Sequence, residues 1–364
     1  MTDTIQIHLP PKADRSYTVH VRNGILGELP SLLPRVWRGK DLFIITDSNV
    51  AGLYGGNLLR SLHAGGFQAT MLDFPAGEES KNARVAYVLQ SHLLEAQIRR
   101  ESLIIALGGG VVGDIAGYVA ATVLRGVRFV QIPTTLLAQV DSSVGGKVGI
   151  DHPIGKNLIG AFHQPLAVFV DPVVLRTLPA GEFRNGLAEI VKIAAALDSR
   201  MFGTLERAAS RIRRDRPRLL AEVIAQAIGL KGAVVARDEF EQGLRKALNL
   251  GHTIGHAIEA SSGFEIPHGA AVAMGMVAES KIAVRLGLLT DREYRRLVSL
   301  LETLRLPTRM PAIRRRKKFL AALYADKKAD AGGLKFVLLE GIGSSVVGVD
   351  VPFAIVSNVC SVSV

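Results

Sequence analysis

The feature that most constrains the fold is a change in hydrophobic periodicity near residues 172–180. Before it, short β-branched runs alternate with segments of helix length; the runs are residues 41–48, 67–74, 102–110 and 127–135. This alternation predicts an α/β sheet domain. After Leu178 the helical period of about 3.6 residues dominates, over 182–196, 216–236, 267–287 and 290–304, with one late strand candidate at 334–341. We therefore expect an α/β N-terminal domain over residues 1–177 and an all-α C-terminal domain over residues 178–364.

The length of 364 residues fits two domains, because a domain commonly takes roughly 150 residues. No internal repeat or low-complexity linker separates the halves, so we expect them to pack closely with a cleft between them. The single cysteine, Cys360, excludes a disulfide framework and fits a reducing compartment. The N-terminus lacks a basic segment followed by an apolar core, and no run of about 20 apolar residues occurs. We expect a cytoplasmic protein that does not span a membrane.

The net charge of +11 raises the question of an anionic partner. The densest basic runs, 211–216 and 314–318, lie in segments with helical apolar spacing, and only 5% of residues are aromatic. Both properties favour solvated helix faces over a nucleic-acid surface. Other lysines and arginines lie beside Gly, Asn and His in motifs. These predict small anionic ligands, with no nucleic acid and no membrane as partner.

The segment GGGVVGD at 108–114 follows a buried-strand run and precedes a helical pattern. Glycines in this arrangement let backbone N–H groups and a helix N-terminus approach a pyrophosphate closely. Two departures weaken the dinucleotide reading: the motif is not at the first strand, and no acidic residue ends the next strand. Asp47, at the end of an earlier strand run, is an alternative ligand for a ribose hydroxyl. A structural glycine-rich turn remains the competing interpretation.

The next stretch, residues 141–160, is rich in Gly, Lys, Asn and Asp and poor in apolar periodicity. It is predicted to be a long ordered loop, and such loops commonly carry function. Lys147, Lys156 and Asn157 would supply cationic and amide donors to a phosphate or carboxylate. A solvent-exposed loop without function is the alternative.

Three of the nine histidines, His252, His256 and His268, fall within seventeen residues. His252 and His256 are four apart, which places them on one helix face and suits a divalent metal ion. The glutamate that follows the first histidine in zinc proteases is absent, so a protease is disfavoured. The alternative is two hydrogen-bonded helix histidines and a loop histidine without a metal.

A carboxylate ligand must come from elsewhere, and Glu189 is a candidate. Glu189 and Lys192 share one helical face in the apolar segment GLAEIVKIAA. A Glu–Lys pair three residues apart is usually a surface ion pair. Here the apolar neighbours predict burial, and burying such a pair is costly without a ligand.

These motifs together resemble one known family, 3-dehydroquinate synthase of the sugar-phosphate cyclase superfamily. The resemblance covers nearly the whole chain, through residues 76–81, 108–114, 124–150, 155–165, 178–192, 244–259, 268–276 and 326–328. It implies an NAD-binding α/β domain, a helical domain that holds the metal, and a homodimer. It also implies catalytic NAD and a Zn²⁺ or Co²⁺ ion.

The resemblance assigns the metal ligands as Glu189, His252 and His268, which makes His256 a catalytic or proton-relay residue. The implied NAD contacts are Asp47, Gly77, Glu78, Lys81, Gly110, Val111, Val112, Gly113, Asp114, Thr134, Thr135, Lys147, Lys156, Val174, Leu175, Arg176 and Thr177. The further implied catalytic residues are Lys147, Lys192, Asn157 and Asp141. The implied substrate contacts are Lys231, Arg245, Asn249, Lys327 or Lys328, and Arg125 from either subunit.

The implied reaction converts 3-deoxy-D-arabino-heptulosonate 7-phosphate to 3-dehydroquinate and phosphate. Its implied steps are transient oxidation by NAD, phosphate elimination, reduction, ring opening and aldol closure. A cyclase acting on sedoheptulose 7-phosphate or glucose 6-phosphate is the main alternative, and a polyol dehydrogenase is another. The apolar C-terminus, residues 348–364, departs from the helical ending expected of the family. It is predicted to be a packed strand, an interface segment or a disordered tail.

Overall fold

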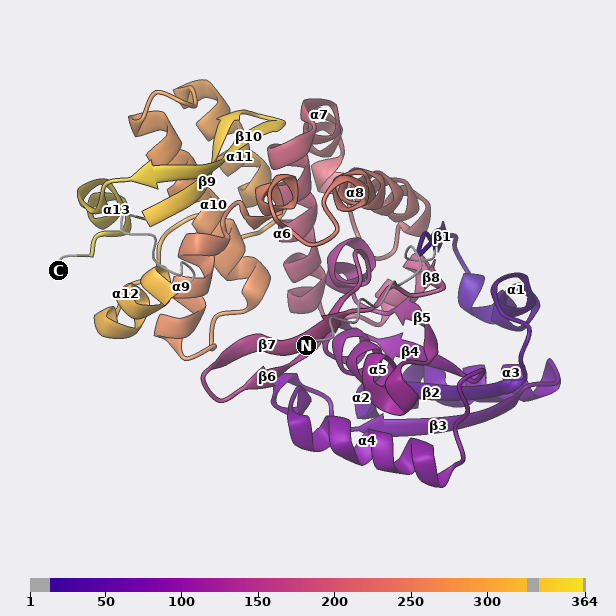
Figure 1. Cartoon of the computed structure of the whole chain (residues 1–364). Helices are drawn as coiled ribbons and strands as arrows, with labels where there is room; N and C mark the ends of the chain where they lie inside the picture. Colours follow the sequence, from indigo (N-terminus) through magenta and orange to yellow (C-terminus); the bar gives the residue numbers. More distant parts are fainter. Residues whose placement is uncertain (1–13, 326–333, 363–364) are drawn as a thin grey trace, which may run out of the picture.

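The computed structural model describes residues 14–325 and 334–362. Its first half is a six-stranded parallel sheet in the order β1-β8-β5-β4-β2-β3 (Figure 1). The sheet comprises β1 (Thr18–Val21), β2 (Asp41–Asp47), β3 (Gln68–Phe74), β4 (Leu103–Gly108), β5 (Arg128–Pro133) and β8 (Ala167–Val170). All four predicted N-terminal strands are confirmed. They form strands since each is a run of buried or alternating apolar residues.

Helices cover both faces of the sheet, so its central strands are apolar on both sides. Phe43 and Ile45 of β2 pack toward α4 (Ala83–Glu95) and α5 (Gly110–Thr122). Leu42 and Ile44 point the other way, toward α1 (Leu29–Val36) and α3 (Gly56–Ala64). The short helix α2 (Ser48–Val50) follows β2. The first half is therefore a three-layer α/β sandwich.

The second half is mostly helical, as expected (Figure 1). Its helices are α6 (Ala180–Leu197), α7 (Ser199–Ala208), α8 (Pro217–Arg237), α9 (His252–Ser262), α10 (His268–Arg285), α11 (Asp291–Thr303), α12 (Arg316–Ala325) and α13 (Phe353–Cys360). One buried cluster includes residues of this half together with Leu136, Val140 and Val168 from the first. The domain boundary after residue 177 therefore stays a prediction, because the apolar core runs across it.

Residues 141–160 are not the ordered loop that their composition predicted. Most of them form an antiparallel hairpin of β6 (Lys147–His152) and β7 (Gly155–Phe162), which lies between the two halves in Figure 1. Val148 and Ile150 are buried in the cluster that contains α5, which explains the strand. The sequence did not indicate strands here because Gly149 and Gly160, which face each other across the hairpin with no room for a side chain, are residues typical of loops.

The C-terminus also differs from a purely helical domain. The predicted strand at 334–341 is confirmed as β9 (Leu334–Gly341), and it pairs antiparallel with β10 (Ser344–Val351). The last apolar segment continues as α13, which packs on α10. The basic run 211–216 lies in the connection before α8 rather than within a helix, and residues 314–318 are exposed.

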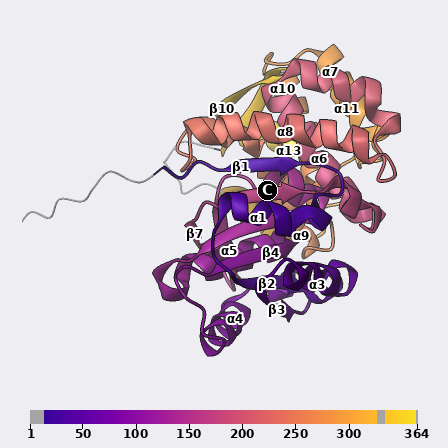
Figure 2. The same cartoon turned by 90° about the vertical axis from the view of Figure 1, so that its right-hand side faces the viewer.

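Among the described residues, α8 is the one helix long and apolar enough to cross a membrane, with a mean hydropathy of 1.7. Leu220, Ile224 and Ile228 of this helix are buried in the protein core. Figure 2 shows α8 lying beside β1, and the two elements are in contact. Its apolar face thus has a partner within the chain, as expected of a core helix.

The order of the strands creates a topological switch point at the carboxyl ends of β2 and β4. The chain leaves β2 toward β3 on one side, and leaves β4 toward β5 on the other. In parallel sheets such a switch point is where ligands bind. Asp47 ends β2 and Gly108, the first residue of the glycine motif, ends β4, so Asp47 and the glycine motif meet at this switch point.

Glycines let α9 approach α10 closely. A Cβ added at Gly275 of α10 would lie 2.0 Å from the carbonyl oxygen of Gly251, and one at Gly255 would lie 3.2 Å from the carbonyl oxygen of Ala271. Gly251, which precedes α9, also has φ of +80°, a conformation that favours glycine. The position of α9, which begins with His252, therefore depends on backbone contact with α10.

We expect the substitution G275A to lower the free energy of unfolding by about 1–3 kcal/mol, because the added methyl must push α9 away from α10. The matched control is G229A in α8, where an added Cβ meets nothing within 4 Å. Removing that glycine should raise stability by about 0.4–1 kcal/mol. Urea denaturation of the three proteins measures both effects, and equal midpoints for G275A and the parental chain would contradict the packing argument.

Candidate functional site

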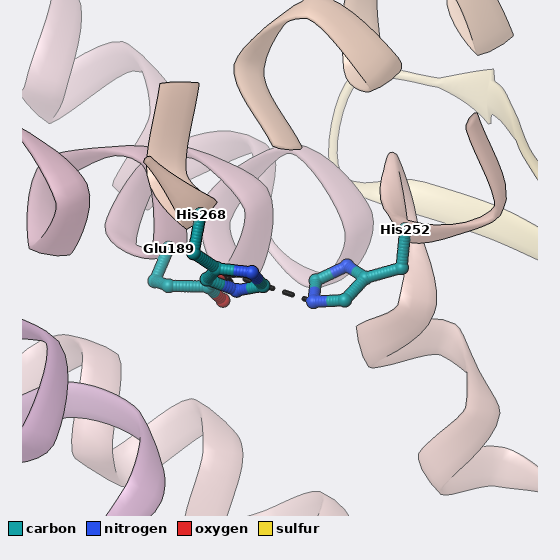
Figure 3. A group of neighbouring side chains, drawn as sticks. All are labelled: Glu189, His252 and His268. Carbon is teal, nitrogen blue, oxygen red and sulfur yellow. Dashed lines mark ion pairs between the residues drawn. The ribbon is translucent and has the colours of Figure 1, made fainter. Parts of the chain in front are cut away.

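Three side chains from three helices meet in the second half of the chain. Glu189 comes from α6, while His252 and His268 are the first residues of α9 and α10. The Oε1 atom of Glu189 lies 3.3 Å from Nε2 of His268 and 3.8 Å from Nε2 of His252. Figure 3 shows His252 projecting toward Glu189 and His268 from the opposite side. These are the three residues that the resemblance implies as metal ligands.

The carboxylate of Glu189 carries its charge in the interior of the protein. Glu189 is fully buried, and Lys192 of the same helix contacts its carboxylate. Although burial favours the neutral acid, Lys192 and the histidines hold the pKa of Glu189 well below its ordinary value. Burial and the positive charge of Lys192 push the pKa of His252 well below its ordinary value. The carboxylate is therefore charged and His252 is neutral, the forms that a divalent ion requires.

The donor set fits a divalent metal ion. Both oxygens of Glu189 are buried and lack a hydrogen bond of normal geometry within the described residues. A charged carboxylate in that state is costly without a further cation. His252 donates from Nδ1 to the carbonyl oxygen of Leu250, which leaves Nε2 facing Glu189. One carboxylate oxygen and two imidazole nitrogens within 4.8 Å of one another could hold Zn²⁺ or Co²⁺.

A second group, His256, Glu259 and His268, also has its ligand atoms within 4.8 Å of one another. It competes with the first for His268. Nδ1 of His268 is hydrogen-bonded to Glu259 at 3.2 Å, which directs Nε2 toward Glu189 instead. A carboxylate that orients a ligand histidine in this way is common around protein-bound metals. The first group therefore fits a metal better, and His256 lies beside it, with its ring centroid 5.2 Å from that of His252.

A cavity of about 560 Å³ opens beside this group, with His252 in its wall. Four cationic side chains line it: Lys147, Lys192, Lys231 and Arg245. Asp114, Asp141, Asn157 and Asn249 also line it. The cavity thus brings together eight sequence-predicted residues from the hairpin, the glycine motif and the helical half, in addition to His252. Its charge suits an anionic, hydroxylated ligand.

The cations of the cavity are held by specific partners. Lys231 donates to the backbone oxygen of Asp141 at 2.6 Å and also contacts its carboxylate. Arg245 donates to the carbonyl oxygens of Gly145 and Glu239. These bonds fix the direction of each charged group before a ligand arrives, which lowers the entropic cost of binding.

Glu241 is a cavity residue that the sequence did not reveal. Lys147 contacts its carboxylate, and Asn249 donates to it at 3.0 Å. Glu241 has φ of +58°, an unusual conformation that no sequence pattern indicated. Glu259 was also missed, although its position three residues after His256 on one helix was a usable signal.

The glycine motif forms the turn between β4 and α5. The backbone N–H of Thr134 donates to the carbonyl oxygen of Gly108, which joins this turn to the end of β5. A Cβ at Gly109 would lie 3.0 Å from the Thr135 side chain. No side chain caps the N-terminus of α5, which begins at Gly110. The turn therefore lets a ligand approach the backbone closely and leaves the N–H groups at the start of α5 uncapped. Both features fit a pyrophosphate.

Several other predicted NAD contacts are held by hydrogen bonds or ion pairs. Lys81 donates to Asp114 at 2.5 Å and also contacts Asn157, which links the glycine motif to the hairpin. Lys156 pairs with Glu78 at 3.2 Å. Thr177 follows the short helix Pro172–Arg176, and its hydroxyl is hydrogen-bonded to the hydroxyl of Tyr54 at 2.6 Å. Asp47 accepts hydrogen bonds from the N–H groups of Asn49 and Val50 at the start of α2.

Arg125, a predicted substrate contact, is not found in the cavity. Arg125 follows the C-terminal end of α5, roughly 20 Å along the helix from Gly110. It does not line the cavity, so its contact with the substrate stays a prediction. Lys327 and Lys328 lie outside the described residues.

Comparisons with known proteins identify the family of this chain. The family profile for the N-terminal part of 3-dehydroquinate synthase matches residues 71–185, and that for the C-terminal part matches residues 186–329. A curated 3-dehydroquinate synthase from Geobacter metallireducens is 46% identical over 332 residues, which is 91% of this chain and 92% of the relative. The chain belongs to the 3-dehydroquinate synthase family.

Two solved structures of related enzymes resemble the fold. One is the 2-epi-5-epi-valiolone synthase ValA from Streptomyces hygroscopicus subsp. jinggangensis 5008 with NAD⁺ and Zn²⁺ bound. It has a TM-score of 0.88 and 28% identity, with 98% of each chain covered. The other is a 2-deoxy-scyllo-inosose synthase complexed with carbaglucose-6-phosphate, NAD⁺ and Co²⁺. It has a TM-score of 0.84 and 27% identity, over 94% of this chain and 95% of that one.

Metal binding to the metal-free chain should release about one proton per ion at pH 8. Burial opposes the charged form of His268, but its contacts with Glu189 and Glu259 outweigh that effect and raise the pKa of His268 to about 10. Because Glu189 is ionised and His252 neutral, His268 alone must lose a proton. Zinc titration calorimetry in buffers of different ionisation enthalpy measures the release. The E259Q variant should release less, and no release from the parental chain would contradict the assignment.

Proposed function

We propose that this chain is a phosphate-eliminating lyase that converts 3-deoxy-D-arabino-heptulosonate 7-phosphate to 3-dehydroquinate and phosphate. The observation that carries the proposal is the cavity in which four cationic side chains lie beside Glu189, His252 and His268. The substrate has a carboxylate, a phosphate and several hydroxyl groups, and the cations and amides of the cavity would bind them. Membership of the family supports the same reaction.

The cofactors of this reaction would be NAD and Zn²⁺ or Co²⁺. The metal ligands would be Glu189, His252 and His268, and NAD would occupy the switch point between Asp47 and the glycine motif. When bound, the ion would act as a Lewis acid on a substrate hydroxyl, and NAD would accept a hydride from the substrate and return it. Two related structures with NAD⁺ and a divalent ion support this pair of cofactors.

The phosphate would bind where the hairpin meets the helical half. Lys147 and Asn157 of the hairpin line the cavity on this side. Their donors would hold the phosphate dianion and stabilise the negative charge that grows as it leaves. We also propose a homodimer, in which Arg125 of the partner subunit would add a further charge, because Arg125 of the same chain does not line the cavity.

The carboxylate and hydroxyl end of the substrate would lie near the helical half. Lys231, Arg245 and Asn249 would hold it, with Asp141 keeping Lys231 in place. Lys192 would balance Glu189 and bind a hydroxyl. His256, beside His252, would take up the proton that the substrate loses on oxidation. We assign the enzyme to the cytoplasm, where the buried thiol of Cys360 stays reduced.

The substrate assignment is tested with purified protein, catalytic NAD and Zn²⁺. We expect phosphate release without net NADH formation from 3-deoxy-D-arabino-heptulosonate 7-phosphate, and no phosphate from sedoheptulose 7-phosphate or glucose 6-phosphate. The physical reason is that only the first substrate has a carboxylate for Lys231 and Arg245 to bind. Phosphate release from another sugar phosphate alone would overturn the substrate, and net NADH would indicate a dehydrogenase. Samples treated with a chelator control for the metal.

The pH dependence of kcat/KM tests the phosphate site. Burial, together with the charges of Arg245 and Lys231, lowers the pKa of Lys147 to about 8. Lys147 therefore loses its charge in the free enzyme as the pH rises through about 8, and kcat/KM should fall there. The K147R variant keeps its charge, so its fall should move to higher pH. A parental profile that stays flat from pH 7 to pH 9 would contradict the assigned role.

A further inference from the structure

A carboxylate from α10 lies against the start of α9. Glu279 is fully buried in the interior of α10, more than two turns from His268. Its Oε2 atom accepts a hydrogen bond from the N–H of Gly251 at 2.5 Å, and its Oε1 atom accepts one from the N–H of Ile254 at 3.1 Å. No side chain at the N-cap position, Gly251, performs this task. Glu279 thus acts as a cap supplied by another helix, where the helix dipole also favours negative charge.

The capped turn is the one that orients His252. Nδ1 of His252 donates to the carbonyl oxygen of Leu250 at 3.2 Å, and this bond leaves Nε2 facing Glu189. Leu250 immediately precedes Gly251, whose N–H is held by Glu279. The direction of the imidazole therefore depends on a peptide that Glu279 holds in place.

Close packing couples the two helices further. A Cβ at Gly251 would lie 2.6 Å from the Met276 side chain and 2.8 Å from the carbonyl oxygen of Val272. The turn cannot shift toward α10, and the hydrogen bonds to Glu279 keep it from moving away. His252 enters the site from this turn, so its position should be sensitive to small changes there.

We propose that Glu279 is a positioning residue for the metal site, and that it acts by fixing the Leu250–Gly251 turn and through it the direction of His252. The inference rests on the proposed metal ligands. Glu279 contacts neither the substrate nor the ion in this account. Its effect is on the geometry of a ligand, which makes metal affinity the direct measure of its role.

The test compares zinc affinity of the parental chain and E279Q by competition with a chelator. Gln keeps the size of the side chain but replaces one acceptor with a donor, so one of the two N–H groups loses its partner. We expect zinc affinity to fall roughly ten- to hundredfold, as for other residues that orient ligands. The Co²⁺-loaded variant should also show a changed visible spectrum, because that spectrum reports ligand geometry.

A matched control separates this role from simple helix stabilisation. Thr290 caps α11 through a capping box with Glu293, away from the site. The T290A variant should lower thermal stability and leave zinc affinity unchanged. Affinity is measured well below each unfolding midpoint, and E279D replaces E279Q in the same comparison if E279Q does not fold. Parental zinc affinity in the Glu279 variant, with a loss of stability like that of T290A, would overturn the proposal.

A double-mutant cycle shows whether Glu279 acts through His252. In the H252A background, adding E279Q should cause no further loss of zinc affinity. In the H268A background, the loss caused by E279Q should persist. Equal losses in both backgrounds would overturn the proposal. If the parental chain itself binds no zinc, the proposed metal site fails; if it binds zinc and E279Q has no effect, only the role of Glu279 fails.

Discussion

The buried carboxylate of Glu189 is the charge around which the site is organised. It lies fully buried in α6, and the groups that balance it come from the same helix and from two others. Lys192 reaches it from the next turn of α6, while His252 and His268 reach it from α9 and α10. A charge in this setting is tolerated only with matched partners. The relative placement of α6, α9 and α10 is therefore constrained by electrostatics as well as by packing.

Backbone contact sets that placement. Gly269 of α10 packs against the backbone of Asn185 in α6, and Gly275 packs against Gly251. These contacts bring the beginnings of α9 and α10 near the middle of α6. A similar logic operates in the sheet half, where the glycine turn after β4 and Asp47 after β2 meet at one switch point. The cavity is lined by residues of the sheet half and of the helical half, and the hairpin β6–β7 contributes further lining residues.

The sequence predicted the parts whose signal is local. The central strands were identified as short, continuous apolar runs, and the long helices by apolar residues that recur at helical spacing. The hairpin was mistaken for a loop because Gly149, Lys156 and Asn157 resemble loop composition, while the burial of Val148 depends on distant α5. Spacing alone suggested His252 with His256 as a ligand pair. The structure turns His268 toward Glu189 through Glu259, a contact between helices that no local pattern contains.

The central claim is that one ion is held by Glu189, His252 and His268. The most direct measurement is anomalous X-ray scattering at the zinc edge from crystals of the Zn²⁺- and NAD-loaded protein. The account predicts one strong peak within bonding distance, about 2.0–2.2 Å, of the Glu189 carboxylate and Nε2 of both His252 and His268. A peak bounded instead by His256, Glu259 and His268 would contradict it.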